Sequence, residues 1–427
     1  MRSRLERCLW WGLGVTLVAL AVAVGALLWP TAQAEAPAAS STASPTSSPV
    51  TAISVVPTSI TRPPPSPAPP SATSTPPASA TPINTTPPTL DDFWDGRATW
   101  KVDVFDTGLP LGESDTILRP DGQLWSYLHA SAQSAGVVDQ WGEPVPFPGC
   151  VTLWKSSDGG RRFQLTEPRC LIACQNRPCT TEAGDHINQQ QYPRVMQAGD
   201  GTFYMVYEWG GRAYLRTSPD GLRWGPAERV PGTGIWKDFE RPCAPHERIN
   251  PFPLLPDLYA CLAGAPPGLW VEGDRLYVFV GMGKSPANLG CFTGLRAEGA
   301  RAMQPCSANP LFTGAAVYGR TDTISAEMNP YFDFHIISSA DVLKVGERYY
   351  LVYEGMRGTN QFALGLARSV GPEINGPWEK YPGNPILMDL PGNIGVGHGD
   401  LIVLDGATYL YTTTSSTTRG RYVLVWK

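Results

Sequence analysis

The chain has 427 residues, a formal net charge of −5 and 17% charged side chains. This acidic balance, without any run of five lysines or arginines, argues against a nucleic-acid or anionic-lipid partner and directs attention to neutral or mildly polar ligands. The length could hold two or three average domains, but the composition changes sharply along the chain.

Residues 1–34 have the pattern of a targeting or anchoring segment. Three arginines among the first seven residues precede an uncharged apolar run from Cys8 to Trp29, which is long enough to span a bilayer. The length of this run favours an uncleaved anchor, whereas the triplet Ala32-Gln33-Ala34 favours signal-peptidase cleavage. In both cases the basic flank stays inside, so we expect the rest of the chain to be extracellular, either tethered or secreted.

Residues 35–90 are dominated by serine, threonine, proline and alanine. Such a segment lacks the apolar side chains that would offset the entropy of ordering, and its prolines favour extended polyproline II conformations. We expect a disordered, semi-rigid linker. Contact with a membrane is expected only through the N-terminal segment that precedes it.

From residue 91 to residue 427 the chain is rich in tryptophan, tyrosine, valine, glycine and aspartate, without long helical periodicity. One unit recurs five times: a short apolar strand, a turn with glycine and an acidic residue, and an aromatic-rich strand. Marker aromatic residues in the five units are 78, 74, 73 and 59 residues apart, which leaves room for four strands in each. The aromatic strands are expected at 124–129, 203–208, 276–280, 349–354 and 409–412. The repeats predict an all-β domain built as a five-bladed β-propeller.

The two ends of this domain predict how the ring closes. The last repeat ends with its third strand at 421–426 and has no fourth strand. A β-rich segment at 98–105 precedes the first repeat and has no repeat of its own. Placed as the outer strand of the last blade, this segment closes the ring and removes an open sheet edge. The alternative is a β-sandwich with fortuitous internal similarity.

Eight cysteines lie beyond the apolar N-terminal run, an even number that suggests disulfides in an exported chain. Three of them, Cys170, Cys174 and Cys179, are close enough in sequence to raise a zinc site as the alternative, although their spacing is not that of a zinc ribbon. The others are Cys150, Cys243, Cys261, Cys291 and Cys306.

Two segments match the Asp-box pattern, 156–163 and, shortened by one residue, 218–224. In this pattern the aspartate caps a tight hairpin, glycine supplies positive φ and an aromatic residue anchors the turn. Asp158 and Asp220 are therefore expected to be structural rather than catalytic.

The segment 98–427 resembles the five-bladed glycoside hydrolases, a group of arabinanases, xylosidases and arabinofuranosidases. The resemblance is clearest at Ser339–Glu354, Leu364–Ser369 and Gly397–Asp400. It implies a carbohydrate ligand and acidic chemistry at the starts of the innermost strands. It also implies that His398 lies on the propeller axis near a bound calcium ion. We expect a monomer.

Asp115, Asp341 and Asp400 each precede a predicted inner strand by the same offset, so all three should face the axis. Glycoside hydrolysis needs two carboxyl groups, about 5–5.5 Å apart for retention or about 6.5–9.5 Å apart for inversion. The resemblance implies that Asp115 is the general base and Asp341 a second acid. Glu354 or Glu208 is then the proton donor.

The sequence departs from the hydrolase pattern in the second and third repeats. The inner-strand positions there read Gln191-Tyr192-Pro193-Arg194 and Pro266-Pro267-Gly268, without a carboxylate. We assign Arg194, Glu208 and Asp400 to ligand binding. The incomplete acid set leaves two functions open, a glycosidase and a non-catalytic module that binds carbohydrate or the cell envelope. A sialidase, suggested by the Asp boxes, would normally need six blades.

Overall fold

The computed structural model describes residues 86–146, 149–172, 190–209, 212–233, 266–282, 287–314, 332–333, 336–356, 362–388, 396–415 and 417–427. The predicted anchor and the predicted linker as far as residue 85 lie outside the described residues. Within the described residues, no helix is long and apolar enough to cross a membrane.

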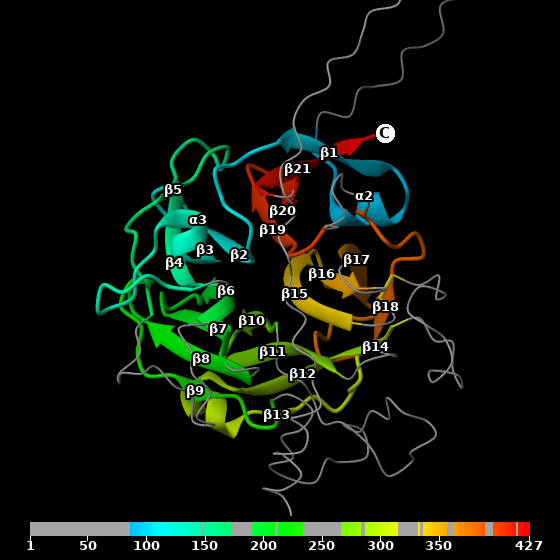
Figure 1. The fold of residues 1–427 in the computed structure, drawn as a ribbon. Coiled ribbons are helices and arrows are strands. Elements are labelled where there is room, and N and C mark those ends of the chain that lie inside the picture. Colours follow the sequence, from blue (N-terminus) through cyan, green and yellow to red (C-terminus); the bar gives the residue numbers. More distant parts are fainter. Residues whose placement is uncertain are drawn as a thin grey trace, which may run out of the picture. The chain divides into compact units, whose positions relative to one another are not determined.

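Five antiparallel sheets follow one another along the chain and surround a common axis (Figure 1). Blade 1 consists of β2 (Ser114–Leu118), β3 (Leu124–Ala130), β4 (Cys150–Ser156) and β5 (Gln164–Leu165). Blade 2 consists of β6 (Gln190–Gln197), β7 (Phe203–Trp209), β8 (Arg212–Ser218) and β9 (Glu228–Arg229). Blade 3 consists of β10 (Gly268–Glu272), β11 (Arg275–Met282), β12 (Asn288–Leu295) and β13 (Gln304–Pro305), with β14 (Phe312–Thr313) also paired to β12.

Blade 4 consists of β15 (Ile336–Val345), β16 (Arg348–Met356), β17 (Phe362–Ser369) and β18 (Trp378–Lys380). Blade 5 consists of β19 (Asp400–Leu404), β20 (Ala407–Thr413), β21 (Arg419–Trp426) and β1 (Ala98–Val104). Short helices lie outside the sheets: α2 (Leu90–Trp94), α3 (Ala132–Ala135), η2 (Arg296–Glu298) and η3 (Ala300–Ala302). The predicted five-bladed propeller is confirmed.

The predicted ring closure is also confirmed. β1 pairs antiparallel with β21, from Ala98 opposite Trp426 to Val104 opposite Arg421, and the sheet order is β1-β21-β20-β19. Figure 1 shows β1 from the start of the domain beside β21 from its end. The first described strand therefore covers the edge that β21 would otherwise expose.

The chain already contacts the propeller before β1. Thr89 caps α2 through a reciprocal pair of bonds with Asp92, and Leu90 is fully buried. The Trp426 indole Nε1 donates a 2.8 Å bond to the Thr86 carbonyl. The described part of the linker segment is thus packed against blade 5.

The aromatic strands form the core between neighbouring blades. All seven residues of β3 are buried, as the apolar pattern of a strand covered on both faces requires. Two of the core tyrosines also tie blades together, because the Tyr127 hydroxyl donates to Gly221 and the Tyr411 hydroxyl donates to Gly160, each in a turn of the following blade.

These two turns contain Asp158 and Asp220, which the sequence predicts to be structural. Asp158 Oδ1 accepts bonds from the backbone amides of Arg161 and Arg162, and Asp220 Oδ1 does so from Leu222 and Arg223. Both aspartates therefore serve the local hairpin.

Two disulfides lie within the described residues, Cys150–Cys170 and Cys291–Cys306. The expected disulfides are confirmed at these positions, and the zinc alternative is wrong for Cys170 because its sulfur is bonded to that of Cys150. Cys174, Cys179, Cys243 and Cys261 lie outside the described residues.

Candidate functional site

Inner strands bring polar residues to the axis in two layers. The second layer contains Asp115, Arg194, Asp341 and Asp400. The first layer contains the residues two positions earlier in blades 1, 2, 4 and 5, namely Glu113, Tyr192, Ser339 and His398. Blade 3 has Gly268 at the second-layer position, where an added Cβ would lie 2.5 Å from the Ala340 carbonyl oxygen. A glycine there lets β10 approach β15 closely.

Each second-layer aspartate binds the backbone of the next blade. Asp115 accepts from the Val195 amide of blade 2, and Asp341 accepts from the Leu401 amide of blade 5. Asp400 of blade 5 accepts from the amide of Thr116 in blade 1 at 3.2 Å. The same contact therefore recurs at three of the five blade junctions, so these carboxylates fasten neighbouring inner strands together.

The three aspartates also lie close to one another. One oxygen of each lies within 4.8 Å of the others, and none of the residues is more than 7% exposed. Burial is the main reason that the pKa values of all three are raised, that of Asp341 to about 7. Repulsion by the neighbouring aspartates adds to the effect at Asp115 and Asp341, because like charges in a poorly solvated site disfavour ionisation.

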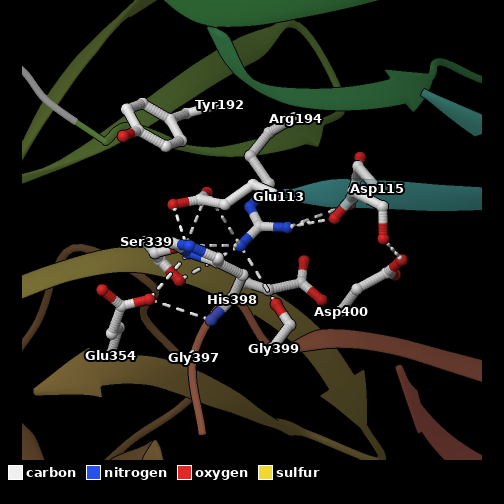
Figure 2. A network of polar contacts seen from close by, with 12 residues as sticks. Glu113, Asp115, Tyr192, Arg194, Ser339, Glu354, Gly397, His398, Gly399 and Asp400 are labelled. Atoms are coloured by element: carbon white, nitrogen blue, oxygen red, sulfur yellow. Dashed lines mark hydrogen bonds and ion pairs between the residues drawn. The ribbon is translucent and has the colours of Figure 1, made fainter. Parts of the chain in front are cut away.

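Arg194 is the cation of the second layer and is only 1% exposed. Its guanidinium donates to the carbonyls of Ser114, Ser339 and Gly399, which belong to blades 1, 4 and 5. It also lies 3.8 Å from Glu113 and from Asp115 (Figure 2). One side chain from blade 2 thus holds three other blades at the axis.

The first layer centres on His398. The His398 Nδ1 atom lies 2.7 Å from a carboxylate oxygen of Glu113 and 2.7 Å from one of Glu354, at the end of β16. Burial alone would lower the pKa of His398, but the charges of Glu354 and Glu113 raise it to about 9. Burial opposes ionisation of Glu113, yet His398 lowers its pKa to about 2. At neutral pH the layer therefore holds a His398 imidazolium against the Glu113 carboxylate.

A second histidine, His129 from β3, stays neutral beside this group. Burial lowers its pKa to about 3, and its Nδ1 accepts bonds from the backbone amides of Glu113 and Tyr192. The Tyr192 ring lies 4.9 Å from the ring of His129 and 6.0 Å from that of His398. These contacts orient the aromatic ring over the first layer.

Three first-layer residues have left-handed backbone conformations, with φ of 56° at Tyr192, 55° at Ser339 and 57° at His398. A non-glycine residue in this region costs on the order of 1 kcal/mol or more and persists only where its surroundings enforce it. The recurrence at the same place in three blades identifies the first layer as the strained part of the axis.

The structure brings together most of the residues that the sequence singled out. Asp115, Asp341, Asp400 and Arg194 share the second layer, and Glu354 meets His398 in the first. Glu208 lies apart on β7, opposite Gln191, and is half-buried. Its charge contributes to the raised pKa of Tyr192, after burial, so it lies near that hydroxyl.

Sequence reasoning missed Glu113 and Arg419. Glu113 stands two residues before Asp115, as His398 stands before Asp400, and this spacing could have identified it. Arg419, at the start of β21, is fully buried and donates to the carbonyls of Gly112 and His398. No repeat signal marks it.

Calcium takes six to eight oxygen ligands in proteins. The carboxylates of Asp115, Asp341 and Asp400 offer such oxygens and could hold a metal ion, although the Arg194 guanidinium beside Asp115 opposes a cation. At His398 the donor set includes an imidazole nitrogen that already lies against two carboxylates, which suits calcium less well. Calcium near His398 stays a prediction.

Fold and site together define a five-bladed β-propeller with charged residues buried in two layers on its axis. No protein-family model matches the chain, and no curated protein matches it in sequence. Among solved structures it matches five-bladed glycoside hydrolases at low sequence identity. The likeness concerns the fold.

Three of these structures illustrate the match. A thermostable family-43 glycoside hydrolase is 14% identical with a TM-score of 0.45, over 75% of this chain and 90% of that one. An exo-1,5-α-L-arabinanase from a bovine ruminal metagenomic library is 14% identical with a TM-score of 0.45, over 77% and 99%. An α-L-arabinofuranosidase from Podospora anserina, in complex with cellotriose, is 14% identical with a TM-score of 0.47, over 77% and 96%.

Proposed function

We propose that this protein is an extracellular propeller that binds a carbohydrate beside the first layer of its axis, with the architecture of a glycoside hydrolase but without its reaction. One observation carries the proposal: the five axial carboxylates described above are all engaged by other groups of the protein. They are Glu113, Asp115, Asp341, Glu354 and Asp400, and none is more than 7% exposed.

A glycosidase has to place its two carboxyl groups on either side of the scissile bond, with room for a sugar or a water molecule between them. The space between Glu113 and Glu354 is occupied by the His398 imidazole. Asp115 and Asp341 lie in the second layer, where each binds a neighbouring backbone amide. This arrangement favours binding over hydrolysis.

The groups that could face a ligand suit a sugar. The His398 side chain is 24% exposed, and the half-buried rings of Tyr192 and Phe362 lie 6.0 Å and 6.3 Å from its ring. The half-buried Glu208 lies near Tyr192. Aromatic rings stack on the apolar faces of sugars, and carboxylates accept bonds from sugar hydroxyls. The sequence assigns Arg194 and Asp400 to ligand binding, but both lie in the second layer, beneath this surface. Arg194 donates a hydrogen bond to the Ser339 hydroxyl, and Asp400 accepts one from the Ser114 hydroxyl.

The disulfides support an oxidising, non-cytoplasmic location. We therefore retain the proposal that residues 1–34 export or anchor the chain. We also propose that the predicted linker acts as a spacer as far as residue 85, because residues 86–90 pack against the propeller, and that the propeller works as a monomer outside the cell.

The test is a glycan-binding screen followed by a turnover screen with aryl glycosides. Tyr192→Ala should weaken binding of the best glycan about two- to tenfold, the range expected for loss of one aromatic contact. Phe105→Ala removes an aromatic side chain that is 61% exposed on the β1 side, and it should leave binding unchanged.

Two outcomes would overturn the proposal. Binding to no glycan in the screen would exclude carbohydrate as the ligand. Turnover of an aryl glycoside that Asp115→Asn abolishes, at an unchanged thermal midpoint, would instead establish the glycosidase alternative.

A further inference from the structure

A surface cavity of about 300 Å³ lies away from the axis, between blades 1 and 2. Its walls come from β4, from the segment 166–171 that follows β5, and from the turn after β8. It shares no residue with the two axial layers. Its volume is at the lower end of the range of small-molecule sites.

The wall of the cavity is preformed. The disulfide between Cys150 and Cys170 joins the segment 166–171 to β4. The Thr166 amide donates to the Leu153 carbonyl at 2.9 Å, and the Leu171 amide donates to the Val151 carbonyl at 2.7 Å. A covalent link and backbone bonds on both sides keep this wall in place, which reduces the entropy that binding would cost.

Two cations stand at the cavity, Lys155 and Arg169. Neither forms an ion pair with any residue in the described part of the chain, and the Lys155 Nζ atom lies 4.3 Å above the Trp125 ring. The one acidic side chain in the lining is Glu167. The cavity therefore carries an excess of positive charge with donors free to meet an anion.

The apolar part of the lining is aliphatic. It is formed by Leu153, Leu171 and Leu222, and Leu222 is 41% exposed and therefore accessible to a ligand. Sugars prefer aromatic platforms, whereas leucine side chains bury compact apolar groups. The lining thus selects an apolar body rather than a sugar ring.

We propose that this cavity binds a small organic anion, a carboxylate carried on a compact aryl or alkyl body. The carboxylate lies against Lys155 and Arg169, and the apolar body covers Leu171 and Leu222. The site is separate from the proposed carbohydrate surface, and its ligand differs from a glycan in both charge and polarity.

Benzoate titrated into the full-length protein, followed by calorimetry and by NMR of the leucine methyl groups, tests the proposal. Benzoate should bind and shift the Leu222 methyl resonances, whereas benzamide, its neutral isostere, should bind more weakly. Arg169→Gln should weaken benzoate binding and Glu167→Gln should strengthen it, each by about two- to fivefold, the effect of one exposed charge.

Lys101→Gln, a charge removal at an exposed position of β1, is the matched control and should leave the benzoate affinity unchanged. Equal weakening by Lys101→Gln would show that only net charge matters and would overturn the site. Benzamide binding as tightly as benzoate, or no shift of Leu222, would overturn it as well. These readouts do not involve glycans, so they stand or fall independently of the proposed function.

Discussion

Gly159 and Gly160 stand side by side in the turn after β4, both with positive φ, but their surroundings differ. A Cβ at Gly160 would lie 2.0 Å from the Tyr411 hydroxyl and 2.6 Å from a Leu124 methyl carbon. A Cβ at Gly159 would meet no atom within 4 Å. The pair therefore separates backbone strain from steric overlap at a single turn.

We predict that Gly159→Ala lowers the free energy of unfolding by about 1–2 kcal/mol, the cost of a left-handed alanine. Gly160→Ala should lower it by about 2–5 kcal/mol, because overpacking of about 1–3 kcal/mol adds to the strain. Urea unfolding of the two variants measures the difference. Equal losses would mean that the contact between Tyr411 and this turn does not hold blades 5 and 1 together.

At the residue scale, the sequence predicted which side chains reach the axis but not what they do there. The common offset of Asp115, Asp341 and Asp400 before their strands places them correctly at equivalent positions. The offset contains no information on the backbone amides of the next blade, because strand-to-strand spacing between blades depends on tertiary packing. Glu113 was not predicted for a related reason, because its contacts with His398 and Ser339 come from other blades and leave no pattern in the local sequence.

At the element scale, the inner strands are joined by carboxylates whose ionisation is disfavoured, and this has a consequence for pH. Burial raises the pKa of Asp341 to about 7, above the ordinary value of 3.8. The folded state then binds more protons than the unfolded state between these two values, so stability falls as the pH rises through 7. The raised pKa values of Asp115 and Asp400 act in the same direction.

We predict that the free energy of unfolding decreases between pH 5 and pH 8, and that Asp341→Asn flattens this decrease by up to about 1.4 kcal/mol per pH unit. The amide oxygen of asparagine can still accept the bond from Leu401, so the variant removes the charge and keeps the contact. Glu347→Gln, at an exposed turn of the same blade, is the control and should keep the wild-type slope. If Asp341→Asn left the pH dependence of the free energy of unfolding unchanged, the raised pKa of Asp341 would be contradicted.

In acid, the first layer changes the free energy of unfolding in the opposite direction. The pKa of Glu113 is lowered to about 2 from 4.5, so the stability that it contributes is present above pH 4.5 and is lost as the pH falls through 2. His398, with a pKa raised to about 9 from 6.5, contributes stability below pH 6.5 that is lost as the pH rises through 9. The two layers thus change the free energy of unfolding in different pH ranges.

At the scale of the whole molecule, repeat spacing and the missing last strand were enough to predict five blades and the strand that closes them. Closure was predictable because an open sheet edge is unfavourable and only one unassigned β-rich segment was available. The long insertions between strands were not predictable, since they carry no repeat, and much of their length lies outside the described residues.

Closure through β1 makes a final prediction about cooperativity. A chain that begins at residue 106 would lack β1, which pairs with β21 along its whole length and buries Ala98 and Trp100 in the core between blades 4 and 5. The exposed edge of β21 would then be free to pair with another chain. We expect this truncated chain to associate and to lose the single cooperative unfolding transition of a chain that begins at residue 86.

A synthetic peptide of residues 86–105 supplies the missing strand in trans and distinguishes an open ring from general misfolding. If the truncated chain fails only because blade 5 is open, the peptide should restore a monomer in sedimentation and raise the thermal midpoint with increasing peptide concentration. A variant peptide with Trp100→Asp should not, because Trp100 lies in the buried cluster beside Leu424. A truncated chain that stays monomeric with the midpoint of the longer one would show that the ring holds together without its N-terminal strand.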